Sequence, residues 1–404
     1  MKRKTSVSRL KSALALRLLS LLLFLAQFAL VPQAEAQDTN LTRFTKIAAG
    51  WDHSLALKSD GTVVAWGYDG SGESTVPGGL NGVVAIAAGG GDSLALKADG
   101  TVVAWGNNGW GQSTVPGGLT GVVAIAAGGY AQSVALKSDG TVVAWGDNGQ
   151  GESTVPGGLR GVVAIAAGFL HTLALKSDGT VVAWGSTAPV PAGLTGVVAV
   201  AAGGYLRGDI DLFGHSLALK GDGTVVAWGY TEQVPDGLTG VVAVAAGRFH
   251  SLALKSDGTV VAWGDNGDGQ TAIPAGLNGV VAVAAGGFHS LALKSDGTVV
   301  VWGENGNGQG MVPSGLNGVV AIAAGENHSL ALVAGPPAIV VQATGNNILL
   351  SWPLWAQGFA LQATTNLADQ NSWTTMTNVP ITMGSQNQVT DAVSGPAKFY
   401  RLKR

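Results

Sequence analysis

The sequence of 404 residues contains no cysteine, which excludes disulfide bonds, thiolate metal sites and cysteine nucleophiles. Charged residues are scarce at 12%, about half of the usual share. Because 46% of the residues are hydrophobic and the net charge is only −3, the composition does not predict a disordered chain. The 63 glycines follow no three-residue period, which excludes collagen. The composition therefore predicts a folded protein without cysteine chemistry.

The N-terminus has the features of a secretory signal peptide, residues 1–36. Six basic residues between Lys2 and Arg17 precede an apolar run from Leu18 to Val31, and Ala34-Glu35-Ala36 fits a cleavage site. A membrane anchor is the alternative, but this run is shorter than the roughly 20 residues that a span needs. We expect cleavage near Ala36, a secreted or periplasmic protein, and no membrane span in the mature chain.

Cleavage would remove six basic residues and one acidic residue, so the net charge would fall from −3 to −8. Proteins that bind nucleic acid through its phosphates need a basic face. An acidic, exported chain is therefore not expected to bind DNA or RNA.

The main signal is an internal repeat. A segment of the form Asp-Gly-Thr-Val-Val-Ala-Trp-Gly occurs seven times, with Val301 in place of alanine in the last copy. Upstream of each copy are Ala-Ala-Gly, a short variable stretch, and Ser-Leu-Ala-Leu-Lys or a close variant. The seven tryptophans are spaced about 39 residues apart: Trp66, Trp105, Trp145, Trp184, Trp228, Trp263 and Trp302.

Each repeat predicts three short strands, such as residues 83–88, 93–97 and 101–105, separated by glycine-containing turns. These strands are apolar on both faces, which favours sheets stacked face to face in a ring. We therefore predict an all-β fold, a seven-bladed β-propeller of three-stranded repeats over residues 37–335. An eight-bladed ring and a linear solenoid are the alternatives.

The first two strands of the repeat occur eight times, but the third strand occurs seven times. One pair of strands is thus surplus to seven blades, either residues 44–57 or residues 319–332. We expect the chain ends to interlock and complete one blade together. Residues 336–404 alternate apolar and polar positions and predict a small β-rich domain, which weakly resembles a fibronectin-III-like sandwich.

The motifs Ala-Ala-Gly-x-x-His-Ser-Leu-Ala-Leu-Lys and Gly-Thr-Val-Val-Ala-Trp-Gly-Asp-Asn-Gly-x-Gly-Gln resemble repeats of the regulator of chromosome condensation family, over about residues 44–333. The short period and the Val-Pro linker are more similar to the secreted propeller-type β-lactamase inhibitory proteins. The resemblance implies a propeller that binds proteins, and β-lactamase inhibition is implied by resemblance only. It also implies contact roles for Trp51, Tyr130, Phe169, Phe249 and Phe288. The second repeat departs from the pattern with Gly90-Gly91-Asp92.

No residue pattern predicts catalysis, a metal site or a cofactor. All six histidines precede the serine or threonine of a second strand, and equivalent positions diverge around a ring, so we expect structural hydrogen bonds instead of metal binding. Residues 265–269 lack the ligand pattern of a calcium loop. No phosphate-binding loop or catalytic triad is present. We therefore do not expect an enzyme.

The variable loops on one side of the predicted ring indicate a recognition surface. Aromatic side chains lie in the first-turn loops (Trp51, Tyr130, Phe169, Tyr205, Phe213, Phe249 and Phe288) and in the exit loops (Tyr68, Trp110 and Tyr230). Thirteen acidic residues accompany them, against Arg207 and Arg248: Asp52, Asp69, Glu73, Asp92, Asp147, Glu152, Asp209, Asp211, Glu232, Asp265, Asp268, Glu304 and Glu326. We predict that this face binds a protein partner of basic character. A carbohydrate ligand is one alternative, and aromatics that fold down as plugs between the blades are the other.

One first-turn loop, Gly204 to Gly214, is about nine residues longer than its equivalents, and the two exit loops beside it are shorter. The insertion carries Tyr205, Arg207, Asp209, Asp211 and Phe213. We expect it to lie over residues 186–189 and 230–233 and to form the chief contact with the partner. A disordered loop is the alternative.

Overall fold

A computed structural model describes residues 43–207, 211–230 and 233–335 of the repeat region. It also describes residues 339–403 except 345–346, 354–355, 357–358, 366–370, 384–385 and 393–398. The predicted signal peptide lies outside the described residues. Within the part that the structure describes, no helix is long and apolar enough to span a membrane.

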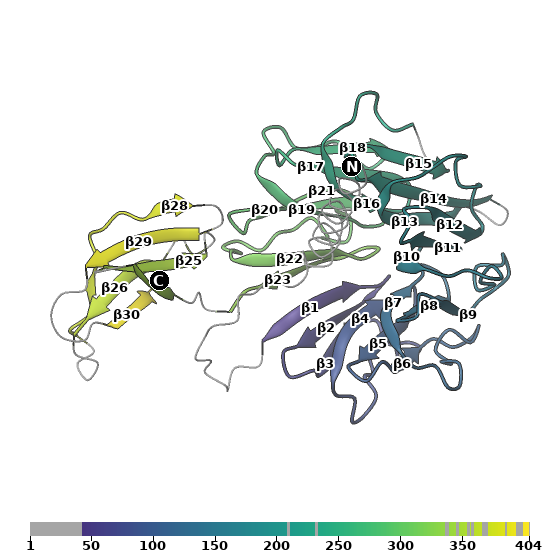
Figure 1. Cartoon of the computed structure of the whole chain (residues 1–404), viewed down its shortest axis with the longest axis horizontal. Helices are drawn as coiled ribbons and strands as arrows, with labels where there is room; N and C mark the ends of the chain where they lie inside the picture. The colour runs from purple at the N-terminus through teal and green to yellow at the C-terminus, as the bar shows by residue number, and fades with distance from the viewer. Residues whose placement is uncertain are drawn as a thin grey trace, which may run out of the picture. The chain divides into compact units, whose positions relative to one another are not determined.

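The repeat region consists of successive antiparallel sheets, in agreement with the predicted all-β propeller (Figure 1). Seven sheets have three strands and the last has two. The strands are β1 Phe44–Ala49, β2 His53–Lys58, β3 Val63–Gly67; β4 Val83–Ala88, β5 Asp92–Lys97, β6 Val102–Gly106; β7 Val122–Ala127, β8 Gln132–Lys137, β9 Val142–Gly146; β10 Val162–Ala167, β11 His171–Lys176, β12 Val181–Gly185; β13 Val197–Arg207, β14 Asp211–Lys220, β15 Val225–Gly229; β16 Val241–Ala246, β17 His250–Lys255, β18 Val260–Gly264; β19 Val280–Ala285, β20 His289–Lys294, β21 Val299–Gly303; and β22 Val319–Ala324, β23 Ser329–Val333.

Tryptophan side chains from the third strands fill the space between neighbouring sheets. Between the first two sheets, Trp105 and Ala95 pack against Leu55, Leu57 and Val63. Equivalent clusters form around Trp145, Trp184, Trp228, Trp263 and Trp302. Each of these tryptophans is 6–7% exposed, so both faces of most sheets are covered, as the apolar strands require.

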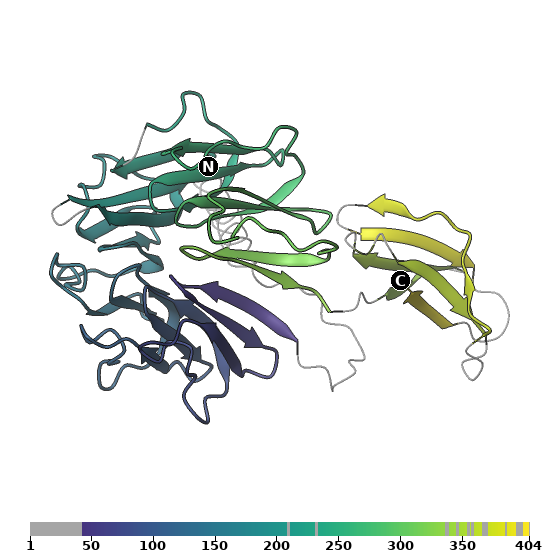
Figure 2. The same ribbon diagram turned by 180° about the vertical axis from the view of Figure 1, so that it is seen from behind.

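The last sheet lies against the first. Strand β1 contacts β22 and β23, lies beside them in both views (Figures 1 and 2), and Glu326 N donates a hydrogen bond to Gly50 O at 3.2 Å. The surplus pair is β22–β23, which forms a sheet of its own. The expected interlocking of the chain ends into one shared blade is therefore wrong for the described residues, because β1 pairs with β2 and β22 with β23.

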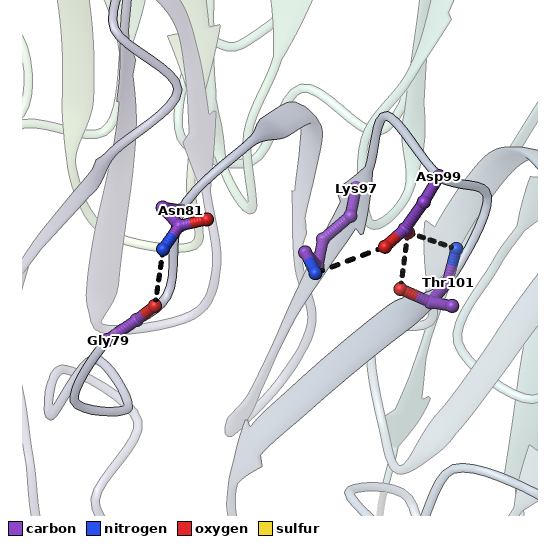
Figure 3. Close-up of polar contacts among 5 residues, drawn as sticks. All are labelled: Gly79, Asn81, Lys97, Asp99 and Thr101. Atoms are coloured by element: carbon purple, nitrogen blue, oxygen red, sulfur yellow. Dashed lines mark hydrogen bonds and ion pairs between the residues drawn. The ribbon is translucent and has the colours of Figure 1, made fainter.

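The Lys-x-Asp-Gly turns at the other end of the strands are nearly identical from repeat to repeat. In the second repeat, Thr101 N and Thr101 Oγ1 both donate to Asp99 Oδ1, and Lys97 pairs with Asp99 Oδ2 at 3.2 Å (Figure 3). These hydrogen bonds and the lysine lower the pKa of Asp99 to about 2. Nearby, Asn81 Nδ2 donates to Gly79 O (Figure 3). Such local bonds stabilise a tight turn.

The C-terminal part contains two further antiparallel sheets. One has the order β24-β25-β29-β28 and the other β27-β26-β30. Leu350, Trp352, Leu361 and Val389, which come from both sheets, form one buried cluster. The strands are β24 Val340–Thr344, β25 Asn347–Pro353, β26 Ala360–Thr364, β27 Thr374–Thr375, β28 Ile381–Met383, β29 Gln386–Ala392 and β30 Phe399–Lys403. The likeness to a fibronectin-III domain stays a prediction.

Candidate binding surface

The Ala-Ala-Gly segments of all eight repeats line one cavity where the inner strands end. Backbone hydrogen bonds join neighbouring repeats around this cavity. Trp51 N donates to Gly89 O at 3.3 Å, and Gly129 N donates to Gly168 O at 2.9 Å. The first-turn loops are therefore fixed to one another and present their side chains from a rigid ring.

A second set of hydrogen bonds links the start of each second strand to the next repeat. His53 Nε2 lies 3.0 Å from Ser93 Oγ, and His328 Nε2 lies 3.0 Å from Ser54 Oγ across the junction of the last and first sheets. The same contact is made by His171, His250 and His289. Burial lowers the pKa values of His171 and His250 to about 3, so these rings are neutral. The predicted structural role is confirmed for these five histidines.

The buried residues of the exit loops also have a structural role, which the sequence analysis missed. Trp105 Nε1 and Ser93 Oγ both donate to the carbonyl oxygen of Glu73. Trp145 Nε1 and Ser133 Oγ donate in the same way to Gln112 O. The signal was present in the sequence, because this position is glutamate in some repeats and glutamine in others. Because a charged glutamate and a neutral glutamine both occur at this position, a negative charge is not required there.

The acidic face is accordingly smaller than the sequence suggested. Glu73, Asp92, Asp147, Glu152 and Glu326 are buried. Asp52, Asp69, Asp265 and Asp268 are exposed. Asp209 and Glu232 lie outside the described residues. The surface charge on this side is therefore carried by fewer carboxylates than the thirteen that the loops contain.

Eight aromatic residues form one contiguous cluster, here called the aromatic layer: Trp51, Trp110, Tyr130, Phe169, Tyr205, Tyr230, Phe249 and Phe288. Phe169 is its centre. Its ring centroid lies 6.0 Å from that of Trp51 with nearly parallel planes, 5.5 Å from Tyr130 and 5.6 Å from Tyr205. Seven of the eight repeats contribute to these and the remaining ring contacts, so the layer extends across much of the loop side.

Exposure divides the predicted site residues into a centre and a rim. Phe169 is only 6% exposed, and five other rings of the first-turn loops are half-buried: Trp51, Tyr130, Tyr205, Phe249 and Phe288. The three aromatics of the exit loops, here called the rim aromatics, are the most exposed: Tyr68 at 61%, Trp110 at 58% and Tyr230 at 49%. The alternative prediction, in which the aromatics fold down between the blades, therefore fits Phe169 at the centre of the layer. The rim aromatics remain accessible to a partner.

An ion pair lies within the aromatic layer. Arg248 pairs with Glu326, and its guanidinium carbon is 3.6 Å from the ring centroid of Tyr205 and 4.9 Å from that of Phe288. Burial raises the pKa of Glu326 and outweighs the opposing effect of Arg248. This cation–π and ion-pair arrangement holds the layer together and removes Arg248 from the list of free surface charges.

The long first-turn loop continues the strands of its sheet. Strand β13 extends to Arg207, and strand β14 begins at Asp211. In the register of the two strands, Tyr205 is opposite Phe213 and Arg207 is opposite Asp211. Tyr205 contacts both Phe169 and Phe249, so the base of this hairpin joins the aromatic layer. Asp209 and the tip of the hairpin lie outside the described residues, as do residues 231–232 of the neighbouring exit loop.

The predictions that concern metals, cofactors and catalysis stay predictions. Among the described residues, no group of three or more histidine, aspartate or glutamate side chains could hold a metal ion. What the loop side offers is an apolar, aromatic surface on a rigid support.

Six segments of the chain match the sequence profile of the regulator of chromosome condensation (RCC1) repeat: residues 44–73, 83–112, 122–152, 162–187, 241–270 and 280–309. The structure is similar to that of Prp20p from Saccharomyces cerevisiae, with a TM-score of 0.50 and 21% identity over 74% of this chain and 87% of that one. That structure was described together with the binding of Prp20p to Gsp1p and histones. The CRINKLY WD40 ectodomain of the Arabidopsis thaliana receptor kinase ACR4 is also similar, with a TM-score of 0.49 and 23% identity over 65% of this chain and 96% of that one. At 21% identity, the likeness to Prp20p shows the fold alone. No match is found among curated protein sequences.

Proposed function

We propose that this chain, which carries regulator of chromosome condensation repeats, is an exported, non-catalytic binding module that recognises a protein partner through its aromatic layer. Propellers of this kind commonly mediate protein binding, and Prp20p, described as binding Gsp1p and histones, is one case. Export rests on the signal peptide predicted from the sequence.

The observation that carries the proposal is the set of rim aromatics around a rigid aromatic centre. Tyr68, Trp110 and Tyr230 expose about half or more of their surface, while Trp110 and Tyr230 are also anchored to the layer by Tyr130 and Phe249. Tyrosine and tryptophan are the residues most enriched among binding hot spots. Because Trp110 and Tyr230 are held by neighbouring rings before a partner arrives, little of their conformational entropy is lost on binding.

The charge around the rim supports a basic partner. Asp52, Asp69 and Asp265 are exposed, and Arg248 is neutralised by Glu326. Complementary charge increases the rate and specificity of association. Inhibition of a β-lactamase, implied by resemblance only, is one specific form of this proposal.

Affinity capture from the periplasm or the culture medium tests the proposal. The mature protein should retain a partner that a variant with alanine at all three rim aromatics does not retain. A glycan array run with the same two proteins tests the carbohydrate alternative. Capture that is identical for both proteins would contradict the proposal, and so would rim-dependent binding to glycans without a protein partner.

The hairpin formed by the long loop provides a second variant. Deletion of residues 205–213 should abolish capture, because it removes Tyr205 and the predicted chief contact. The melting temperature should change little, since the deleted backbone lies beyond the core of the sheet. Full capture by this variant would exclude the hairpin from the contact.

A further inference from the structure

The last repeat sheet has an open edge. Within the described part of the chain, β23 pairs only with β22, whereas the second strand of every other repeat pairs on both sides. The sequence explains the difference, because Ala334-Gly335-Pro336-Pro337 follows β23 where other repeats have the Asp-Gly turn, and prolines do not continue a strand ladder. Ala331 in β23 is exposed, while its equivalents Ala95 and Ala292 are 0% exposed.

The absent third strand leaves a cavity beside this edge, here called the tryptophan slot. It has a volume of about 260 Å³ and is lined by Leu291, Val299, Val301, Val312 and Leu316, among others. The equivalent place between the first two sheets is occupied by Trp105, which packs with Leu55, Val63, Val76 and Leu80. These four residues correspond in the repeat to Leu291, Val299, Val312 and Leu316.

The size and the polar end of the slot both fit an indole. An apolar cavity of roughly 150 Å³ takes up benzene, so a volume of about 260 Å³ accommodates the larger ring. In the second and seventh repeats, Trp105 Nε1 and Trp302 Nε1 donate to the carbonyl oxygens of Glu73 and Gln270. The equivalent carbonyl, Gln309 O, accepts from Ser329 Oγ at 2.8 Å and has no indole donor among the described residues.

The other side of the missing strand is also uncovered. Trp66 is 44% exposed, whereas Trp105 and Trp145 are 6–7% exposed. In the complete second sheet, Val102 lies in one cluster with Leu94, Leu96 and Trp145 of the next sheet. A strand added to β23 would place an apolar residue against Trp66 in the same way, while its tryptophan entered the slot on the opposite side.

We propose that β23 and the tryptophan slot bind an extended segment of another protein, with a tryptophan preceded by β-branched or small apolar residues in the pattern Val-Val-Ala-Trp-Gly. The segment adds to the sheet as an antiparallel third strand. Main-chain hydrogen bonds to the edge supply affinity, and the slot selects the tryptophan. The described tryptophans of the C-terminal part have other contacts and do not fill the slot. Trp352 is 2% exposed, and Trp373 lies under Arg401.

Val301 distinguishes the slot from the equivalent places that a tryptophan fills. The other six third strands have alanine at this point, and only the strand that faces the slot has valine. A larger side chain reduces the apolar area that the slot exposes to water when it is empty. The slot shares no residue with the aromatic layer, so this proposal stands or falls independently of the proposed function.

A fluorescein-labelled peptide with the sequence of residues 99–106, Asp-Gly-Thr-Val-Val-Ala-Trp-Gly, is the probe. Its fluorescence anisotropy is measured with the mature protein, beside a peptide that has alanine in place of the tryptophan. We expect saturable binding that is weaker by about tenfold or more for the alanine peptide. Hydrogen exchange of the amides in Ser329–Val333 should slow when the tryptophan peptide is bound.

Two protein variants localise the binding. Val301→Trp fills the slot and should weaken binding by about tenfold or more. Val123→Trp, at a site on β7 that is 55% exposed, should leave it unchanged. Three results would overturn the proposal: no binding, equal binding of the two peptides, or exchange protection that leaves β23 unchanged. None of them depends on the folding of a variant.

Discussion

At the scale of single residues, one buried position holds the ring of repeats together. It is occupied by His53, Asp92, Gln132, His171, His215, His250, His289 and His328, all of which are buried or half-buried. At seven of these eight positions, all except His215, the side chain makes a hydrogen bond with a serine or threonine of the next repeat, as in the contact between His53 and Ser93. Two of these residues, Asp92 and Gln132, are not histidine. They allow the contribution that the side chain makes to stability to be separated from the contribution of its charge.

The histidines make the fold sensitive to acid. Burial lowers the pKa of His171 to about 3, from a usual value of 6.5, so the unfolded chain takes up a proton below pH 6.5 and the folded chain does not. Stability is therefore lost as the pH falls from 6.5 toward 3, by about 1.4 kcal/mol per pH unit for each such histidine. His171→Gln should lower the number of protons taken up on unfolding by about one, and the free energy of unfolding should then depend less on pH. Gln132, which bonds to Thr172 Oγ1 in the same position, shows that glutamine fits.

Denaturant unfolding at several values between pH 7 and pH 4 measures the slope. At pH 7 the variant should lie within about 1 kcal/mol of the parent protein. An unchanged slope would mean that His171 is not the buried neutral base that its position implies.

Asp92 has the opposite dependence on pH. Burial raises its pKa to about 7, so the folded chain holds a proton that the unfolded chain loses above pH 4. Its contribution to stability is therefore lost as the pH rises from about 4 through 7. Asp92→Asn has nearly the same shape and keeps the acceptor for Ser133 Oγ. It should stabilise the protein by about 1–3 kcal/mol at pH 8 and by much less at pH 4. A variant that is less stable at pH 8 would contradict this prediction.

At the scale of the element, the strands were predictable because each is short, apolar and repeated. The strands predicted at residues 83–88, 93–97 and 101–105 are observed as β4, β5 and β6 with shifts of one residue at most. Contacts between loops were not predictable. Trp51 and Phe169 lie three repeats apart in the chain, and Arg248 and Glu326, which form an ion pair, lie two repeats apart. Neither follows from local periodicity.

The glycine that ends Ala-Ala-Gly is required by close packing at the end of the inner strand. A Cβ at Gly247 would touch the ring of His250 and lie 2.6 Å from Gly286 O. Gly247→Ala should therefore lower the free energy of unfolding by about 2–4 kcal/mol. Gly157→Ala is the matched control, since a Cβ there meets nothing within 4 Å, and it should be neutral or slightly stabilising. Chemical denaturation of both variants checks the pair, and equal stabilities would refute the packing argument.

At the scale of the whole molecule, the two ends of the strands differ in chemistry. The turns around Asp99 repeat with little variation, as in Asp139 and Asp178, and their charges are largely paired. The loop side has unequal loops, exposed aromatics and unpaired carboxylates. This asymmetry was visible in the sequence, but which of the aromatics stay exposed was not, because that depends on how the rings pack against one another.

Association with a basic partner should depend on salt. The exposed carboxylates Asp52, Asp69, Asp265 and Asp268 attract such a partner over a distance that salt reduces to about 10 Å at 0.1 M. The association rate constant should therefore fall steeply between low and physiological ionic strength, with a smaller change in the dissociation rate. Stopped-flow or surface-based kinetics with the captured partner measures both rates. A constant association rate would exclude electrostatic steering.

The most direct test of the central claim compares the two sides of the molecule with the same partner. One variant replaces the rim aromatics Tyr68, Trp110 and Tyr230 by alanine, and the other replaces Lys97, Lys137 and Lys176 in the Asp-Gly turns. Calorimetric titration of the captured partner gives the dissociation constant for each. Binding through the aromatic layer predicts a loss of about 100-fold or more for the first variant and no change for the second. Loss of affinity in the lysine variant alone, with the rim variant unaffected, would contradict the account.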